Sequence, residues 1–481
     1  SNEVAFADDY RFRPDPVIFY AIPKTGAYIL KIHDSLYRGR EDFIYRITVG
    51  EIPFVTGVYP AGGRAGERVS VGVSGWNLPG PQAVLDLRGL SPGTHPFQVC
   101  RSANPVPVHA DSLPERFESE PNDTRTNATA LTLPAIVNGR IGRPGDWDAY
   151  RFEGRAGDSL VAEVFARRLD SPVDSVLRLI DPSGKQVAAN DDREDKGSGL
   201  NTHHADSYLS ARLLSDGTYT VFIGDTQRAG GLAYGYRLRL SAPQPDFELR
   251  VTPSSLNVRA GASVPLTAYA LRKDGFTNAL ELALTGAPAG YRLDGATIPA
   301  GQDQVTFTLS VPLDAPDDAV PLAITGRAVL QGVTVNRPAV PADDMMQAFA
   351  YRHLVPAQEL TSLVVGRLRF RSEVRVMTPS PVRIPAGGSA SVEVNLPTGG
   401  FLSDIQYELA GAPDGLSVKE SAPGRVVLQA DAAKLQPGRS GNLIITATGA
   451  RPLPAGAPKA AGNAFRVPLG AFPAVTYLVT P

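Results

Sequence analysis

The chain has 481 residues, a mass of 51.0 kDa and a formal net charge of −2. Its length predicts about three to five domains, and the near-neutral charge argues against a nucleic-acid partner. The single cysteine, Cys100, excludes an intrachain disulfide and a multi-cysteine zinc site. No run of about 18 apolar residues exists, so we expect no insertion into a membrane.

The first 51 residues repeat a later part of the chain at a constant offset of 191. Eight identities without a gap predict two copies of one domain type. The later copy has roughly ninety residues of the same unit before its repeat, so we expect 1–51 to be the C-terminal part of a truncated domain. Its apolar face would need a cover, and the remainder of a longer polypeptide is an expected partner. The identical pairs are Asp15/Asp206, Gly26/Gly217, Tyr28/Tyr219, Ile32/Ile223, Asp34/Asp225, Gly39/Gly230, Tyr45/Tyr236 and Arg46/Arg237.

Residues 52–112 predict a small β-sandwich. A strand ending at Pro60 leads through a glycine-rich turn into the alternating strand Val69–Ser74, and Gly75-Trp-Asn-Leu78 follows. This order of strand, proline, glycine and strand resembles the immunoglobulin-like folds called IPT/TIG.

Two acidic segments stand out in residues 113–243: the first is Phe117–Thr124 and the second is Gly145–Phe152. In an extended segment, residues two apart point to the same side, so the first segment presents several oxygen-bearing side chains together and the second repeats the pattern. A calcium ion takes about six to eight oxygen ligands, which the two segments could supply jointly. The alternative is that these are turn and edge residues on a solvated rim, because Asn, Asp and Pro favour turns. The candidate metal residues are Glu118, Glu120, Asn122, Asp123, Asp146 and Asp148.

The same region carries an ordered set of motifs. Glu120-Pro-Asn-Asp123 is followed by Gly145–Phe152, Ile180–Gly184, Asn190-Asp-Asp192, and then Gly217-Thr-Tyr219 with Tyr236-Arg237. In that order they resemble a bacterial pre-peptidase C-terminal (PPC) domain. The resemblance covers about 115–242 and implies a jelly-roll sandwich, found as an accessory domain in secreted peptidases and large surface proteins. Several collagen-binding relatives bind calcium.

The resemblance also implies a role for the acidic residues. It matches Glu118, Glu120, Asn122, Asp123 and Asp146 to calcium ligands. Asp148 is an additional candidate, because the spacing of the second pair of acids varies in the family. The copy in residues 1–51 lacks the acidic segment, so we expect no metal site there.

A second repeat predicts two related immunoglobulin-like sandwiches, at 244–342 and 366–481. Thr252-Pro-Ser254 recurs at offset 126, and Leu284–Gly290 recurs at offset 125. Between the sandwiches, 343–365 is expected to be a connector with a short helix over Asp343–His353. Its aspartates can cap a helix, and a proline follows soon after.

Together these patterns predict an all-β chain of tandem β-sandwich domains, a jelly-roll-type PPC domain with immunoglobulin-like sandwiches. The sequence has no His-Glu-x-x-His, no P-loop and no dinucleotide fingerprint, so we expect no enzyme. The leading hypothesis is a non-catalytic segment of a large exported protein (periplasmic, cell-surface or secreted) that acts in binding, adhesion or domain spacing. It would hold structural calcium and meet an extracellular protein or polysaccharide ligand. The alternatives are a substrate-targeting region of a secreted peptidase, whose catalytic domain lies elsewhere, and a carbohydrate-binding module.

Overall fold

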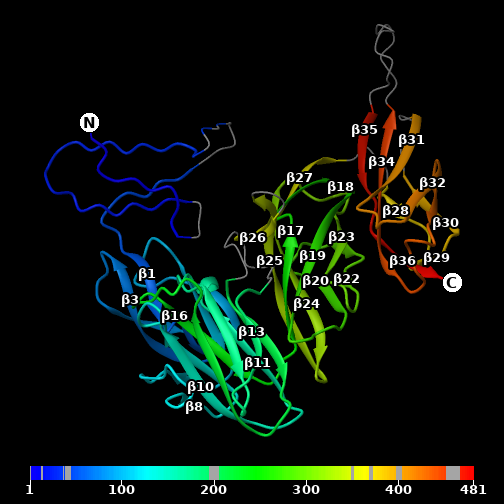
Figure 1. Cartoon of the computed structure of the whole chain (residues 1–481). Helices are drawn as coiled ribbons and strands as arrows, with labels where there is room; N and C mark the ends of the chain where they lie inside the picture. The colour runs from blue at the N-terminus through cyan, green and yellow to red at the C-terminus, as the bar shows by residue number, and fades with distance from the viewer. Residues whose placement is uncertain are drawn as a thin grey trace. The chain divides into compact units, whose positions relative to one another are not determined.

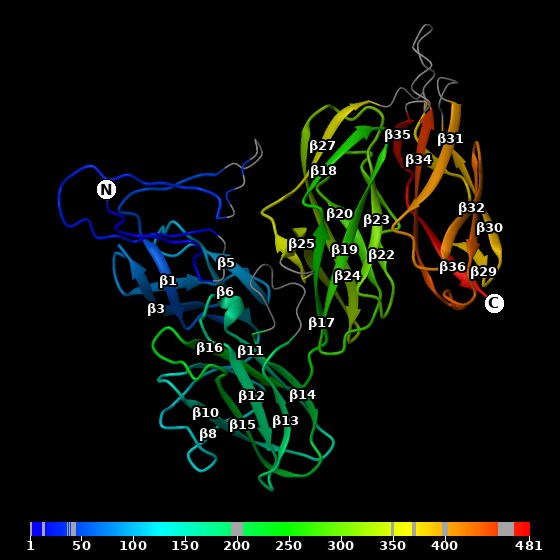
Figure 2. The same ribbon diagram turned by 45° about the horizontal axis from the view of Figure 1, so that its top comes forward.

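The computed structural model describes residues 2–11, 15–35, 37, 39, 45–193, 205–347, 351–367, 372–396, 403–450 and 466–481. The chain divides into two units, Ser1–Gln244 and Pro245–Pro481, and each is described by itself. Within the described ranges the regular structure is β-strand apart from one 3-10 helix, η1 (Arg167–Leu169). This confirms the predicted all-β class (Figures 1 and 2). No helix in these ranges is long and apolar enough to cross a membrane.

The described residues before Phe54 form no strand; their only assigned pairing is an isolated bridge at Tyr10. Figure 1 draws this part as a coil without arrows. Many of its apolar side chains are exposed to solvent, including Ile29 at 81% and Val49 at 78%.

Residues 54–111 form a small sandwich of two three-stranded sheets around their own apolar core. The alternating segment predicted at Val69–Ser74 is confirmed as part of β3, which buries Val71 and Val73 on one face. One sheet is β1 (Phe54–Tyr59), β3 (Arg68–Trp76) and β4 (Gln82–Asp86); the other is β2 (Gly62–Arg64), β6 (Val106–Asp111) and β5 (Gly93–Phe97).

Residues 115–241 form a larger sandwich of two five-stranded sheets, which we call the PPC-like sandwich. Residues two apart on β15 face the core: Tyr219, Val221 and Ile223 are all at most 1% exposed. One sheet has the order β13 (Gln186–Asn190), β12 (Ser175–Ile180), β15 (Gly217–Asp225), β10 (Trp147–Gly154), β8 (Thr129–Ala130). The other has the order β14 (Tyr208–Arg212), β11 (Ser159–Phe165), β16 (Gly235–Ser241), β9 (Ala135–Arg140), β7 (Glu115–Phe117).

The second unit contains the two repeated segments as related strand sets. Its first strands are β17 (Asp246–Thr252), β18 (Ser255–Ala260), β19 (Ser263–Lys273), β20 (Leu280–Thr285), β21 (Arg292–Asp294), β22 (Thr297–Ile298), β23 (Gln304–Ser310), β24 (Ala319–Leu330), β25 (Val333–Gln347), β26 (Tyr351–Pro356) and β27 (Leu360–Arg367). The later strands are β28 (Arg375–Val376), β29 (Val382–Pro385), β30 (Ser389–Asn395), β31 (Ser403–Ala410), β32 (Leu416–Ala422), β33 (Arg425–Ala430), β34 (Ser440–Ala450), β35 (Arg466–Ala471) and β36 (Val475–Thr480). The two sets share one apolar core cluster, and a bridge from β19 to β35 joins Ser263 to Ala471.

The short helix expected over Asp343–His353 is wrong for the described residues. Residues 343–347 belong to β25 and 351–353 to β26, and the two strands pair antiparallel with Asp343 opposite Val355. Residues 348–350 lie outside the described residues. The capping signal is local, whereas strand pairing gives this segment a partner for its backbone groups. The expected connector is also paired further on, because β27 adds to β18 and β24.

Asn442 links the two strand sets of the second unit. Its side-chain Nδ2 donates to the carbonyl oxygens of Gly295, at 2.6 Å, and Thr306, at 2.8 Å. We expect Asn442→Ala to lower the free energy of unfolding by about 1–2 kcal/mol, because both carbonyls lose this donor. Urea unfolding checks this, with Asn278→Ala as the control, since Asn278 donates one exposed bond to Val329 O within the first strand set. An equal loss in both variants would contradict the role of Asn442.

Candidate metal centre

Three carboxylates meet at one end of the PPC-like sandwich. One oxygen from each of Glu118, Glu120 and Asp148 lies within 4.8 Å of the other two. Asp148 is fully buried, Glu118 is partly buried and Glu120 is exposed, so the cluster opens to solvent on one side. Oxygen atoms at this spacing suit a hard divalent cation.

Backbone hydrogen bonds hold the segment after β7 against two strands. Glu118 N donates to Asn138 O of β9 at 3.0 Å, and Ala149 N of β10 donates to Asn122 O at 2.8 Å. The side chain of Glu118 then accepts the Arg140 amide at 2.9 Å on both oxygens. The position of the acidic segment is therefore set by the sheet and not by local turn geometry alone.

Asn122 lies against the carboxylate cluster and is fully buried. One terminal atom of its amide lies 2.9 Å from Glu120 Oε2 and 3.2 Å from Asp148 Oδ1. With nitrogen at that position, the amide donates to both carboxylates. Turned by 180°, it adds a fourth oxygen to the set, and a cation is the partner that such an all-oxygen group needs.

Burial makes the ionised cluster costly in the absence of a cation. It raises the pKa of Asp148 to about 9, although the hydrogen bond from Tyr236 opposes this; the Glu118, Asp146 and Glu120 carboxylates raise it further. Burial also raises the pKa of Glu118 to about 7, against the Arg140 amide, and the Glu120 and Asp146 charges add to the rise. A positive ion would relieve both the repulsion and the lost hydration.

Two tyrosines hold Asp148 in place. Tyr236 Oη donates to Asp148 Oδ2 at 2.6 Å, and the hydroxyls of Tyr150 and Tyr236 lie 2.6 Å apart. Burial raises the pKa of both phenols well above 10, so they remain donors. A side chain at Gly139 would clash with Tyr236 and come within 2.7 Å of Glu118 Oε2, which explains the glycine at this point of β9.

The structure does not bring all six sequence-predicted residues to one point. Asp123 pairs with the exposed Arg143, with 2.7 Å between Asp123 Oδ1 and Arg143 Nη2. Asp146 also lies beside Arg143, at 3.3 Å from Nε, and accepts the Gly142 amide at 2.8 Å. Glu118, Glu120, Asn122 and Asp148 form the inner group, and these two aspartates flank it. The sequence did not predict that Tyr150 and Tyr236 support the site, although Tyr236 belongs to an identical pair of the repeat, Tyr45/Tyr236.

Tyr59 of the small sandwich reaches the same region. Its hydroxyl donates to Asn138 O at 3.2 Å, and the Arg140 guanidinium carbon lies 3.5 Å from the centre of its ring. Burial and the nearby Glu118 charge raise the pKa of Tyr59 to about 12. The two sandwiches of the first unit are therefore joined beside the acidic cluster.

We expect Tyr59→Ala to lower the free energy of unfolding of the first unit by about 2 kcal/mol, because the ring leaves both Arg140 and the sheet. Tyr59→Phe keeps the ring and loses only the hydroxyl bond, so its loss is expected to stay near 1 kcal/mol. Urea unfolding checks both variants. An equal loss of unfolding free energy in the two variants would show that the ring contact with Arg140 does not contribute to stability.

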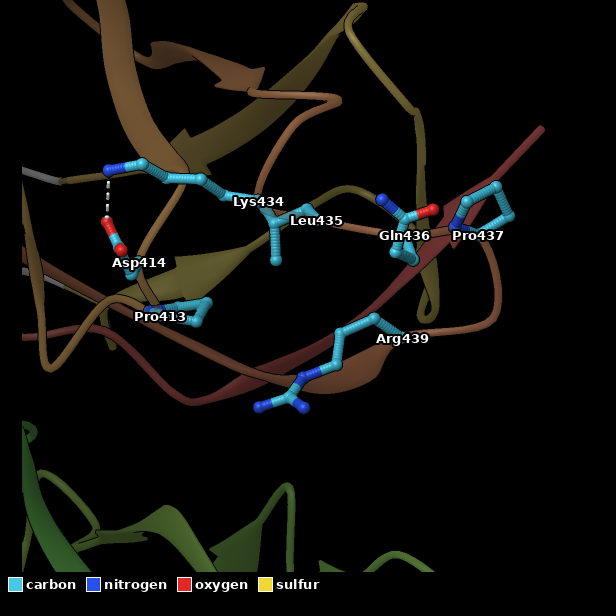
Figure 3. A pocket seen from close by; sticks show the side chains of 7 residues that line it. All are labelled: Pro413, Asp414, Lys434, Leu435, Gln436, Pro437 and Arg439. Atoms are coloured by element: carbon cyan, nitrogen blue, oxygen red, sulfur yellow. Dashed lines mark hydrogen bonds and ion pairs between the residues drawn. The ribbon is translucent and has the colours of Figure 1, made fainter.

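A shallow hollow of about 390 Å³ lies on the last strand set of the second unit (Figure 3). Lys434 and Asp414 form an ion pair at its rim, at 2.9 Å. The rest of its wall is a mixture of apolar and polar side chains with no cluster of like charge, so we assign it no ligand. Its lining residues are Pro413, Asp414, Lys434, Leu435, Gln436, Pro437 and Arg439.

Comparisons with known proteins give one curated relative and several solved structures. No protein-family model matches the sequence. A probable subtilase-type serine protease of Deinococcus radiodurans is 37% identical over 103 residues, which are 21% of this chain and 13% of that protease. The chain thus matches much less than two thirds of that relative's length.

Two of the similar solved structures are β domains. One is the pre-peptidase C-terminal domain of a collagenase from Bacillus anthracis, 14% identical, which covers 26% of this chain and 100% of that chain with a TM-score of 0.19. The other is a set of fibronectin(III)-like modules of CbhA from Clostridium thermocellum, 12% identical, covering 48% and 94% with a TM-score of 0.14. A pre-peptidase C-terminal domain is thus among the solved structures similar to this chain.

Proposed function

We propose that the chain is a non-catalytic, calcium-stabilised β-sandwich accessory region of an exported bacterial protein, and that it serves beside a peptidase domain. The observation that carries the calcium part is the inner group, in which the carboxylates of Glu118, Glu120 and Asp148 meet and the buried Asn122 amide lies against two of them. The partial match to a subtilase-type protease supports the association with a peptidase.

The inner group suits calcium better than a transition metal. Its donors are carboxylate and amide oxygens, without a histidine or cysteine, and the exposed side leaves room for water ligands. Calcium concentrations are high outside cells, which agrees with an exported protein. The bound ion would fix the segment after β7 onto β9 and β10 and so stiffen the end of the sandwich that meets Tyr59.

Isothermal titration calorimetry with calcium chloride tests the site on the whole chain. We expect one calcium ion per chain, and we expect Glu120→Gln to remove the binding heat. Asp123→Asn tests whether the ligands include Asp123, as the sequence predicts, or only the inner group. In the structure the Asp123 carboxylate pairs with Arg143. Glu153→Gln, on β10 but outside the inner group, is the matched control and should bind as the parent does. No binding heat from the parent chain would refute the calcium part.

The carbohydrate-binding alternative has less support. A sugar site needs an open aromatic ring, yet Trp76 stacks on Phe19, with 5.0 Å between ring centres, and on Phe54, with 5.3 Å. The Arg178 guanidinium lies over Trp147 at 4.5 Å. Binding of the chain to a glycan array would restore this alternative, and binding to insoluble protein substrates would favour substrate targeting for a peptidase.

A further inference from the structure

The repeat in residues 15–50 can be compared side chain by side chain with its complete copy. Eight apolar residues of this segment are between 44% and 78% exposed, and the residues at offset 191 are all at most 4% exposed. The pattern of buried positions has therefore been kept while the burial is absent. The pairs, with exposures, are Ile18 45%/Leu209 4%, Ile22 64%/Leu213 3%, Tyr28 45%/Tyr219 1%, Leu30 56%/Val221 0%, Ile32 45%/Ile223 0%, Tyr45 70%/Tyr236 3%, Ile47 44%/Leu238 0% and Val49 78%/Leu240 0%.

The topology of the PPC-like sandwich explains why the described residues of 15–50 form no strands by themselves. In the complete copy, the equivalent strands are β14, β15 and β16. β14 pairs with β11, β15 pairs with β10 and β12, and β16 pairs with β11 and β9. None of the three pairs with another of the three, because β15 and β16 are each inserted between two strands from residues 135–180 and β14 lies at a sheet edge beside β11. Three such segments have no mutual partner for their backbone groups.

The conserved charges of the repeat point to the same partner. Asp206 accepts the backbone amides of Ala166, at 3.1 Å, and Arg167, at 2.6 Å. Asp225 accepts the amide of Asp174 at 2.9 Å.

The third charge, that of Arg237, is also paired with a residue in the first half of the sandwich. Arg237, fully buried, forms an ion pair with Glu115 at 2.7 Å. These three residues recur as Asp15, Asp34 and Arg46, and every partner just named lies in the first half of the sandwich, residues 115–174.

We propose that residues 15–35 and 45–50 form an interaction surface for a half-sandwich of the same type as residues 113–205. The occupant supplies four strands equivalent to β9, β10, β11 and β12. It also carries an acid that faces Arg46 and loop amides that face Asp15 and Asp34. Residues 17–21, 26–34 and 45–50 then become the strands that interleave with it. Hydrophobic burial and the three charged contacts would stabilise this association together.

A fusion protein tests the proposal with a defined occupant. Residues 113–205 are placed directly before Asp15 in the chain 15–481, which reproduces the junction between Ala205 and Asp206. We expect hydrogen exchange of the amides in 26–34 and 45–50 to slow by at least about 100-fold relative to the parent chain, since paired strands open only with the sandwich. The matched control carries Leu30→Asn and Ile47→Asn in the same fusion and should lose this protection, because it places polar groups in both sheets.

Two results would overturn the proposal. One is exchange in 26–34 and 45–50 that is as fast in the fusion as in the parent. The other is protection of these amides in the parent chain itself, together with a concentration-dependent dimer in sedimentation, since a second copy would then be the occupant. Binding of an apolar fluorescent dye by the parent, reduced by Leu30→Asn/Ile47→Asn, would independently support the exposed face in solution.

Discussion

Calcium is expected to raise the midpoint of thermal unfolding of the PPC-like sandwich, and Asp148→Asn is expected to remove that rise. A ligand that binds only the folded state stabilises it in proportion to the logarithm of its free concentration. At a thousand times the dissociation constant the gain is about 4 kcal/mol. For a domain of this size the midpoint should move by roughly 10 °C or more. The measurement is calorimetry of the whole chain in calcium and in a chelator.

The controls for this experiment separate a bound ion from a general salt effect. Glu153 lies on the same strand as Asp148, at the end away from the inner group. The variant Glu153→Gln should therefore respond to calcium as the parent does. Magnesium should act more weakly, because it demands tighter octahedral geometry than this open group provides. Superimposable curves in calcium and chelator would leave the acidic segment as a turn and nothing more.

Without calcium, the stability of the first unit is expected to fall as the pH rises from about 5 to 9. The pKa values of Glu118, about 7, and Asp148, about 9, lie above their ordinary values near 4 in the unfolded chain. The folded state therefore keeps protons that the unfolded state has released. The stability contributed by these two protonated carboxyl groups is fully present below about pH 4. It is lost as the pH rises through about 7 for Glu118 and about 9 for Asp148. Each unit of pKa difference between the folded and unfolded states corresponds to about 1.4 kcal/mol of stability.

Urea unfolding in a chelator over this pH range measures the slope. Asp148→Asn should flatten the part between pH 7 and 9, because the amide does not ionise. Saturating calcium should reduce the slope in the parent, since the ion holds the carboxylates in their charged form. A parent chain whose stability is flat between pH 5 and 9 would contradict the buried, uncompensated cluster.

Much of the fold was accessible from local patterns. The strand at Val69–Ser74 was predicted from alternation, and it is part of β3 in the structure. Alternation reports which side chains face a core, and this information lies within a few neighbouring residues. The repeats added the grouping of strands into related sandwiches.

The failed helix shows where local information ends. Asp343 and Asp344 are good capping residues, yet they lie opposite Val355 and Leu354 in a hairpin. Propensity differences per residue are small compared with the gain from adding a strand to an existing sheet. β25 is paired with β24 and β17 before residue 342, and its continuation carries β26 as a hairpin partner. The strands β24 and β17 lie outside the window 343–353 in which the capping signal was read.

The acidic segments show the same division. Their composition by itself indicated an oxygen-rich cluster, and the repeat by itself indicated that residues 15–50 belong with a second half-sandwich. Only the tertiary structure decided that Asp148 points into the inner group while Asp123 and Asp146 pair with Arg143. The register of β10 against β15 and the backbone bonds from the acidic segment to β9 and β10 set that choice. Residue type is written in the sequence, but the meeting of side chains far apart in the chain depends on how the sheets pair.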